Sequence, residues 1–167
     1  MRRTRPHIFP ILTTLTVAAV PQPMQSKNMT QNRLPRGLRN NNPGNIVKSG
    51  TKWLGEVKGT DARFCTFSNM AYGYRALIRL LQTYQWRHGL RTPKELIGRW
   101  APACENNTGR YVERVCRSTG FGPNQVLDLG VKDTAVRMAA AISLVENGRK
   151  ADMADVEAGW RMLAGRE

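Results

Sequence analysis

The chain has 167 residues, enough for one domain with a substantial core and an N-terminal extension, but short for two domains. Its 26 Lys and Arg residues against 12 Asp and Glu residues give a formal net charge of +14, which favours polyanionic partners such as nucleic acid, anionic lipid or the bacterial envelope. Because the basic residues are scattered, without a run of five, nucleic acid is the weaker of these alternatives.

Residues 1–28 differ in composition from the rest of the chain. A basic start, MRRTRPH, precedes the apolar stretch IFPILTTLTVAAV, and this order is that of a secretory signal peptide. The alternative is that translation begins at Met29 and that the upstream segment is a mis-called gene start. In either case we expect a single domain over residues 29–167. The apolar stretch is too short to cross a bilayer as a helix, and no other segment is expected to do so.

The first part of the domain favours turns and short extended segments. Residues 33–60 are rich in Asn, Gly, Pro and Lys, and NNNPGN is a turn cluster. Strands are predicted over residues 52–57 and 63–67, around a turn at residues 58–61. These segments would form a small hairpin.

The rest of the chain is predicted to be helical. A first long helix should stop near Gly89, and a capping box that ends with Glu95 opens a second, shorter one. The pattern predicts a mainly α (α+β) domain of about five helices with a small β-hairpin lobe. The expected N-terminal caps of the five helices are, in chain order, Ser68, Thr92, Asn107 or Thr108, Asp133 and Asp152.

Few residues suit metal or nucleophilic chemistry. Cys65, Cys104 and Cys116 form no CxxC pair, so we expect reduced thiols and no zinc site, with a Cys104–Cys116 disulfide as the alternative. The two histidines, His7 and His88, fall in the N-terminal segment and at a helix end. No metal or cofactor is therefore expected.

The stretch MAAAISLVENG places a carboxylate at the end of an apolar helix. The next member of its apolar stripe is Glu146, although a helix C-terminus and an apolar face both disfavour the charged form. A carboxyl group that holds its proton near neutral pH suits general acid catalysis of glycoside cleavage. The alternative is a side chain that turns to solvent beside the terminating glycine. The earlier members of the stripe are Ala135, Met138, Ala139 and Ile142.

A second candidate carboxylate, Glu105, lies in RWAPACENNTGRY. Asn106, Asn107, Thr108 and Tyr111 follow it and gather hydrogen-bonding groups that suit the hydroxyls and amides of an amino-sugar chain. The alternative is that ENNT only caps the next helix.

Five segments together carry a resemblance to a known family: LPRGLRNNNPGNI, TKWLGE, FCTFSNMAYGYRALIRLL, RWAPACENNTGRYVERV and AISLVENG. They are similar to phage and prophage proteins described as structural or virion-associated. The resemblance extends over residues 34–160. It implies a phage or prophage origin, with virion proteins as partners.

A second resemblance bears on mechanism. GNI, W-x-G and F-x-x-F-S before a helix are similar to the β-lobe of bacterial cell-wall glucosaminidases of the lysozyme-like superfamily, and RWAPACENNTGRY is similar to a later segment of theirs. Their catalytic glutamate precedes this pattern, whereas the first carboxylate here is Glu56, after Asn45. Because AISLVENG resembles the glutamate-bearing helix end of lysozyme-like transglycosylases, the comparison implies a circular permutation that places this helix last.

These resemblances imply a lysozyme-like domain that cleaves peptidoglycan glycan strands, with Glu146 as general acid and Glu105 as auxiliary carboxylate. The protein would act in the virion, or in the periplasm if residues 1–28 are a signal, and would otherwise be made in the cytoplasm. The alternative is a non-catalytic virion structural protein or cell-wall-binding protein. The residues expected to bind the glycan are Asn42, Asn45, Trp53, Trp100, Asn106, Thr108 and Tyr111.

Overall fold

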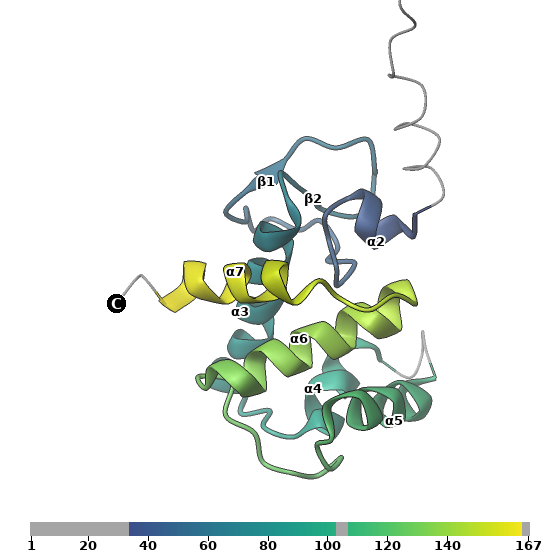
Figure 1. Ribbon diagram of the computed structural model, residues 1–167, viewed down its shortest axis with the longest axis vertical. Coiled ribbons are helices and arrows are strands. Elements are labelled where there is room, and N and C mark those ends of the chain that lie inside the picture. Colours follow the sequence, from purple (N-terminus) through teal and green to yellow (C-terminus); the bar gives the residue numbers. More distant parts are fainter. Residues whose placement is uncertain (1–33, 103–106, 165–167) are drawn as a thin grey trace, which may run out of the picture.

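The structure is a computed structural model that describes residues 34–102 and 107–164 (Figure 1). Glu105, Asn106, Cys104 and the signal-like segment therefore lie outside the described residues. Within the described ranges the chain forms helices and one two-stranded antiparallel sheet, which confirms the mainly helical fold with a small hairpin. The elements are α2 (Arg36–Arg39), β1 (Glu56–Val57), β2 (Thr66–Phe67), α3 (Met70–His88), α4 (Pro93–Trp100), α5 (Thr108–Thr119), α6 (Lys132–Asn147) and α7 (Met153–Ala164).

The hairpin is shorter than predicted. Residues Glu56 and Val57 pair with Phe67 and Thr66, and an isolated bridge joins Val47 to Phe64. The chain before β1 is a tight turn, because the Glu56 amide donates to the Trp53 carbonyl oxygen and the Glu56 carboxylate accepts from the Trp53 amide. Side-chain bonding to the local backbone thus replaces the extended conformation expected over residues 52–55.

A similar turn shortens the second strand. The Asp61 carboxylate accepts from the amides of Arg63 and Phe64, and these hydrogen bonds lower the pKa of Asp61. Residues 61–64 are therefore held in a carboxylate-capped turn, and strand pairing begins only at Thr66.

Three of the five predicted helix starts are confirmed, including that of α7, which begins at Met153 directly after Asp152, and two need correction. The capping box of Thr92 and Glu95 is present, and Asn107 caps α5. Helix α3 is capped by Asn69 instead of Ser68, because the Asn69 side chain accepts from the Tyr72 amide. Helix α6 begins earlier in the chain than predicted, because Val131 and not Asp133 occupies the N-cap position. Asp133 lies in the first turn of the helix, where it pairs with Arg137.

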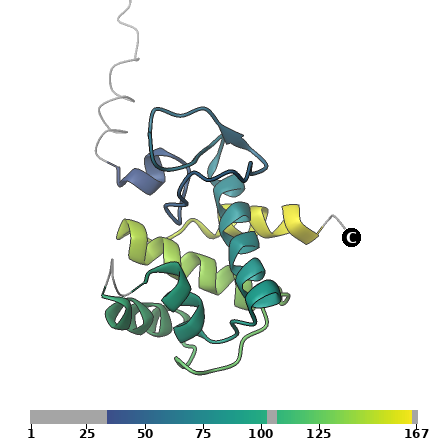
Figure 2. The same cartoon turned by 180° about the vertical axis from the view of Figure 1, so that it is seen from behind.

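Helix α6 runs through the middle of the domain. Both cartoon views place it between the hairpin lobe with α2 on one side and helices α4 and α5 on the other, while α7 crosses α3 (Figures 1 and 2). Its predicted apolar stripe is buried, with no exposed surface at Ala135, Met138, Ala139 or Ile142. The helix therefore carries Glu146 from the centre of the core to the boundary between the two parts of the domain.

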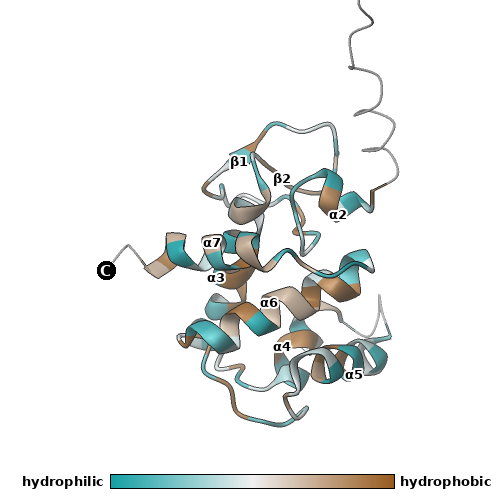
Figure 3. Ribbon diagram, viewed as in Figure 1, coloured by the Kyte–Doolittle hydropathy of each residue, from teal (hydrophilic) through white to brown (hydrophobic). Residues whose placement is uncertain are grey.

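Helix α5 covers one side of this core. Hydrophilic and hydrophobic residues alternate along it (Figure 3), and Tyr111, Val112 and Val115 face inward. The inward side brings Tyr111 close to the end of α6.

The 40–45 segment, which precedes the hairpin, packs closely against α3 at Gly73. A Cβ atom at this position would overlap the Asn41 carbonyl oxygen and lie 2.6 Å from Pro43 Cδ. Gly98, also in a helix, has open space around it. We expect Gly73→Ala to lower the free energy of unfolding by roughly 1–3 kcal/mol through overpacking, and Gly98→Ala to raise it by about 0.5–1 kcal/mol through helix propensity.

Urea unfolding of both variants tests this contact, and Gly98→Ala is the matched control for the propensity change. Equal effects of the two substitutions would show that α3 and the 40–45 segment do not meet at Gly73.

Candidate active site

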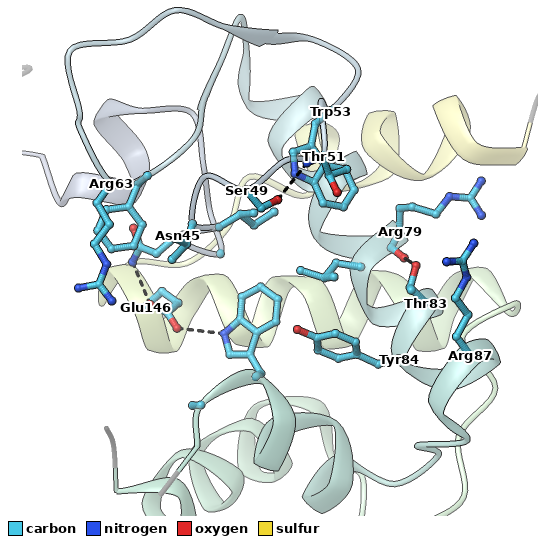
Figure 4. Close-up of a pocket in the computed structure, with 17 residues that line it drawn as sticks. Asn45, Ser49, Thr51, Trp53, Arg63, Arg79, Thr83, Tyr84, Arg87 and Glu146 are labelled. Atoms are coloured by element: carbon cyan, nitrogen blue, oxygen red, sulfur yellow. Dashed lines mark hydrogen bonds between the residues drawn. The ribbon is translucent and has the colours of Figure 1, made fainter. Parts of the chain in front are cut away.

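A cavity of about 700 Å³ opens at the boundary between the hairpin lobe and the helices (Figure 4). Helix α3 forms one wall with Arg79, Thr83, Tyr84 and Arg87, and Glu146 lies at the end of α6. The remaining lining comes from residues 44–53, from residues 63–64 and from residues 100–101 at the end of α4. Segments far apart in the sequence therefore share one cavity.

The Glu146 carboxylate accepts three hydrogen bonds from three different parts of the chain. The Asn45 side-chain amide donates to Oε2 at 2.8 Å. The Trp100 indole N–H and the Tyr111 hydroxyl donate to Oε1 at 3.2 Å and 2.7 Å. The side chain is half-buried at the cavity and does not turn away into solvent beside Gly148. Three donors thus bind one acidic group, and its Oε1 atom accepts two of the three hydrogen bonds.

Tyr111 is a persistent donor in this cluster. It is buried at 9 % exposure, and burial, followed by the nearby Glu146 charge, raises the pKa of its hydroxyl. The phenol therefore keeps its proton over the range in which most proteins function.

Trp100 reaches Glu146 because the chain at Gly44 has no side chain. A Cβ atom at Gly44 would lie 2.9 Å from the Trp100 ring. The indole thus packs directly on the backbone of the 40–45 segment, and this packing aims its N–H at the carboxylate.

The NNNPGN segment is held by its own asparagine side chains. Asn42 has no exposed surface, and its amide bonds to the backbone of Ile46 and Cys65. Asn45 has a φ of 49°, in the left-handed region where asparagine is well tolerated. Next to Glu146, Asn147 donates to the Pro43 carbonyl oxygen at 2.8 Å. Asn42 therefore shapes the segment, and Asn45 contacts the carboxylate.

The other residues predicted to bind a glycan are placed as follows. Trp53 lines the cavity, and its indole nitrogen is buried without a hydrogen-bond partner in the described part of the chain. Thr108 lies outside the cavity lining and donates to the Ala101 carbonyl oxygen at 2.6 Å. The structure thus gathers Asn45, Trp53 and Trp100 around the cavity with Glu146, whereas Asn42 and Thr108 have backbone partners.

Sequence reasoning missed the arginines of this site. Arg79 and Arg87 on α3 and Arg63 on the hairpin lobe line the cavity. The spacing of Arg79, Thr83 and Arg87, at i, i+4 and i+8, places them on one face of α3 and is a signal that could have found them. Among the lining residues that the structure describes, Glu146 is the one carboxylate.

No group of three or more His, Cys, Asp or Glu side chains in residues 34–102 and 107–164 is arranged to hold a metal ion. In the same ranges no helix combines the length and apolarity that a membrane span requires.

Comparison with known proteins identifies the family. No family model matches the chain. Over 121 residues it is 39 % identical to Protein P5 of Pseudoalteromonas phage PM2, an alignment that covers 70 % of this chain and 74 % of that protein. The chain belongs to this family of phage proteins. The predicted phage relationship is therefore confirmed.

The hydrogen bond from Tyr111 to Glu146 should contribute measurably to stability. We expect Tyr111→Phe to lower the free energy of unfolding by about 1–3 kcal/mol, because the half-buried Glu146 carboxylate loses the hydrogen bond that the buried phenol donates. Tyr72→Phe is the matched control, since the half-buried Tyr72 hydroxyl makes no hydrogen bond within the described residues. Chemical denaturation at neutral pH measures both; a Tyr111→Phe effect no larger than that of Tyr72→Phe would contradict the contact.

The same contact gives a pH dependence. An unfolded tyrosine ionises near pH ~10, but the native pKa of Tyr111 is raised. Above about pH 10 the unfolded chain loses a proton that the native chain keeps, so stability falls as pH rises. The stability difference between the wild type and Tyr111→Phe should therefore narrow by about 1.4 kcal/mol per pH unit above pH ~10. Denaturation at a series of alkaline pH values tests this, and a constant difference would mean that native Tyr111 ionises normally.

Proposed function

We propose that this phage-family protein binds bacterial peptidoglycan and cleaves its glycan strands, with Glu146 as the proton donor. The observation that carries the proposal is the position of Glu146: it is a carboxylate at a cavity of about 700 Å³, oriented by Asn45, Trp100 and Tyr111. A fixed carboxyl group at a cavity is what acid-catalysed glycoside cleavage requires.

The rest of the cavity suits a sugar chain. Aromatic rings of Trp53, Tyr84 and Trp100 offer flat apolar surfaces, and the side chains of Ser49 and Thr51 supply hydrogen-bonding groups between them. A mixed lining of aromatic and polar side chains matches the alternating apolar faces and hydroxyl edges of a pyranose ring. The resemblance to lysozyme-like glucosaminidases points to the same substrate class.

Asn45 allows Glu146 to accept and release a proton. In the charged state the Asn45 amide N–H donates to Oε2. The Asn45 amide oxygen is buried and has no partner among the described residues, so a rotated amide would accept a hydrogen bond from a protonated Oε2. Oε1 already has two donors. We therefore assign the exchangeable proton to Oε2.

In the reaction, Oε2 would pass its proton to the glycosidic oxygen as the bond from that oxygen to the anomeric carbon breaks, and the bond's electron pair stays on the oxygen. The resulting carboxylate would then take a proton from an attacking water, or from the sugar's own 6-hydroxyl group. Water gives a hydrolysed product, and the 6-hydroxyl gives an anhydro sugar. Both routes balance with Glu146 alone as the proton carrier.

Stabilising the cationic sugar requires a second group. Asp61 is not a lining residue, and its carboxylate is occupied by Asn40 and two backbone amides. Glu105 stays the predicted second carboxylate, and the substrate's acetamido group is the alternative. We expect Glu105→Gln to lower turnover by about 10²–10⁴-fold; unchanged turnover would assign this role to the acetamido group.

The second candidate is a non-catalytic virion protein or wall-binding protein. The observation in its favour is that Glu146 also has a structural position, since its three donors come from the 40–45 segment, α4 and α5. A carboxylate can hold three segments together without catalysing a reaction. In this case the cavity would bind wall material and release no fragments.

The substitution Glu146→Gln separates the two candidates. The fold should survive, because the glutamine oxygen can keep the Trp100 and Tyr111 bonds while its NH₂ group donates to a rotated Asn45 amide. If Glu146 is the proton donor, release of glycan fragments from purified sacculi should fall by at least about 10²–10⁴-fold with wall binding retained. Glu113→Gln, at an exposed α5 residue paired with Arg117, is the matched control.

Mass spectrometry of the released muropeptides measures both cleavage and the bond cut. Undiminished release by Glu146→Gln would exclude Glu146 as the acid. Sedimentation of the wild-type protein with sacculi, without any fragment release, would establish the wall-binding alternative. Strong salt-dependent retention on DNA without binding to sacculi would contradict both.

A further inference from the structure

We propose that the α3 wall of the cavity is a subsite for the carboxylates of the peptide stems that branch from peptidoglycan strands. The inference rests on the proposed function and specifies its substrate: a glycan that carries peptides, in preference to a bare amino-sugar polymer. Its basis is the pair of arginines, Arg79 and Arg87, on the same cavity as Glu146.

The α3 wall of the cavity carries positive charge and no negative charge. Helix α3 contains no acidic residue in its 19 positions. One face of α3 carries Arg79, Thr83 and Arg87, and all three line the cavity. About two helical turns separate Arg79 from Arg87. Figure 4 shows the two arginine side chains extending to the same side of α3, away from the Glu146 cluster.

These positive charges have no anionic partner in the described part of the chain. None of the ion pairs there includes Arg63, Arg79 or Arg87. Glu146 does not neutralise them either, because its three donors are an amide, an indole and a phenol. Three arginines against one glutamate leave the described lining with an excess of two positive charges.

One of the two α3 arginines that line the cavity lies over an aromatic ring, and so does Arg99, which lies outside the lining. The Arg79 guanidinium lies 5.9 Å from the centre of the Trp86 ring. The guanidinium of Arg99 lies 5.1 Å from the centre of the Tyr84 ring, which itself lines the cavity. Stacking restricts a guanidinium group but leaves its N–H edge free to donate to a carboxylate. The Arg79 guanidinium can therefore make a bidentate contact to a planar anion.

The chemistry of the ligand follows from this excess charge. A polymer of neutral amino sugars brings no anion to a cationic wall. Peptidoglycan differs from such a polymer because alternate sugars carry a peptide with several free carboxylates. With the glycan strand passing Glu146, a stem that branches from a neighbouring sugar would meet the arginines of α3.

Binding to sacculi with and without stems tests the subsite. The full-length Glu146→Gln protein is used, so that the substrate is not consumed. The sacculi come from a Gram-negative bacterium, whose walls lack teichoic phosphodiesters. An amidase hydrolyses the bond between sugar and stem in half of the sample, which leaves a single lactyl carboxylate in place of the several carboxylates of each stem. We expect about tenfold tighter binding to intact sacculi than to stripped strands.

Adding Arg79→Gln and Arg87→Gln should abolish this tenfold preference. The matched control adds Arg91→Gln and Arg110→Gln, which remove the same charge from exposed positions outside the described lining and should keep the preference. Equal binding to intact and stripped sacculi would overturn the subsite, even if the arginine variants do not fold. If the Arg91→Gln and Arg110→Gln control loses the preference to the same extent, the preference depends on net charge alone. This result would also overturn the subsite.

The outcome is independent of catalysis. If the wild-type protein releases no fragments but the stem-dependent preference is found, the subsite stands and the enzymatic proposal fails. If fragments are released at equal rates from intact and stripped strands and binding shows no preference, the enzymatic proposal stands and the subsite fails.

Discussion

The hydrogen bonds at the C-terminal end of helix α6 hold separate parts of the domain together. Glu146 accepts from Asn45, Trp100 and Tyr111, and the next residue, Asn147, donates to the Pro43 carbonyl oxygen. These bonds link the 40–45 segment, α4 and α5 to the end of α6, a helix whose apolar stripe is buried in the core. Hydrogen bonds to a charged group contribute about 1.5–3 kcal/mol each. The group at the cavity is therefore also the group that sets the geometry of the cavity.

The side-chain amides of the asparagine-rich segment supply several of the hydrogen bonds near the end of α6. Asn41 and Asn45 both have a φ of 49°, a conformation that asparagine adopts more readily than most residues. Their side chains reach different partners, the Phe67 carbonyl oxygen and Glu146, while the buried Asn42 closes the turn internally. An amide both donates and accepts, so a short run of asparagines can satisfy several backbone groups and still present one N–H to the cavity.

Local signals predicted the helices of this protein, and distance in sequence limited the prediction of the site. The Thr92 capping box and the apolar stripe that leads to Glu146 depend on residues within a few turns, and both patterns were readable in the chain. The donors to Glu146 come from 101, 46 and 35 residues away. No periodicity encodes such contacts, and only the packing of Trp100 on Gly44 brings the indole within reach. The strands in the structure are shorter than the sequence predicts, because the Glu56 and Asp61 carboxylates accept hydrogen bonds from nearby backbone amides.

The separation of charges in the cavity links the fold to the chemistry. The three groups that donate to Glu146 are neutral, and none of the ion pairs in the described part of the chain joins Glu146 to an arginine. Burial raises the pKa of Tyr111, so this donor keeps its proton and brings no second negative charge beside the first. The arginines lie on α3 and on the hairpin lobe. In the proposed reaction Glu146 exchanges a proton while the arginines bind an anion, and the placement of these groups on different elements would keep the two tasks apart.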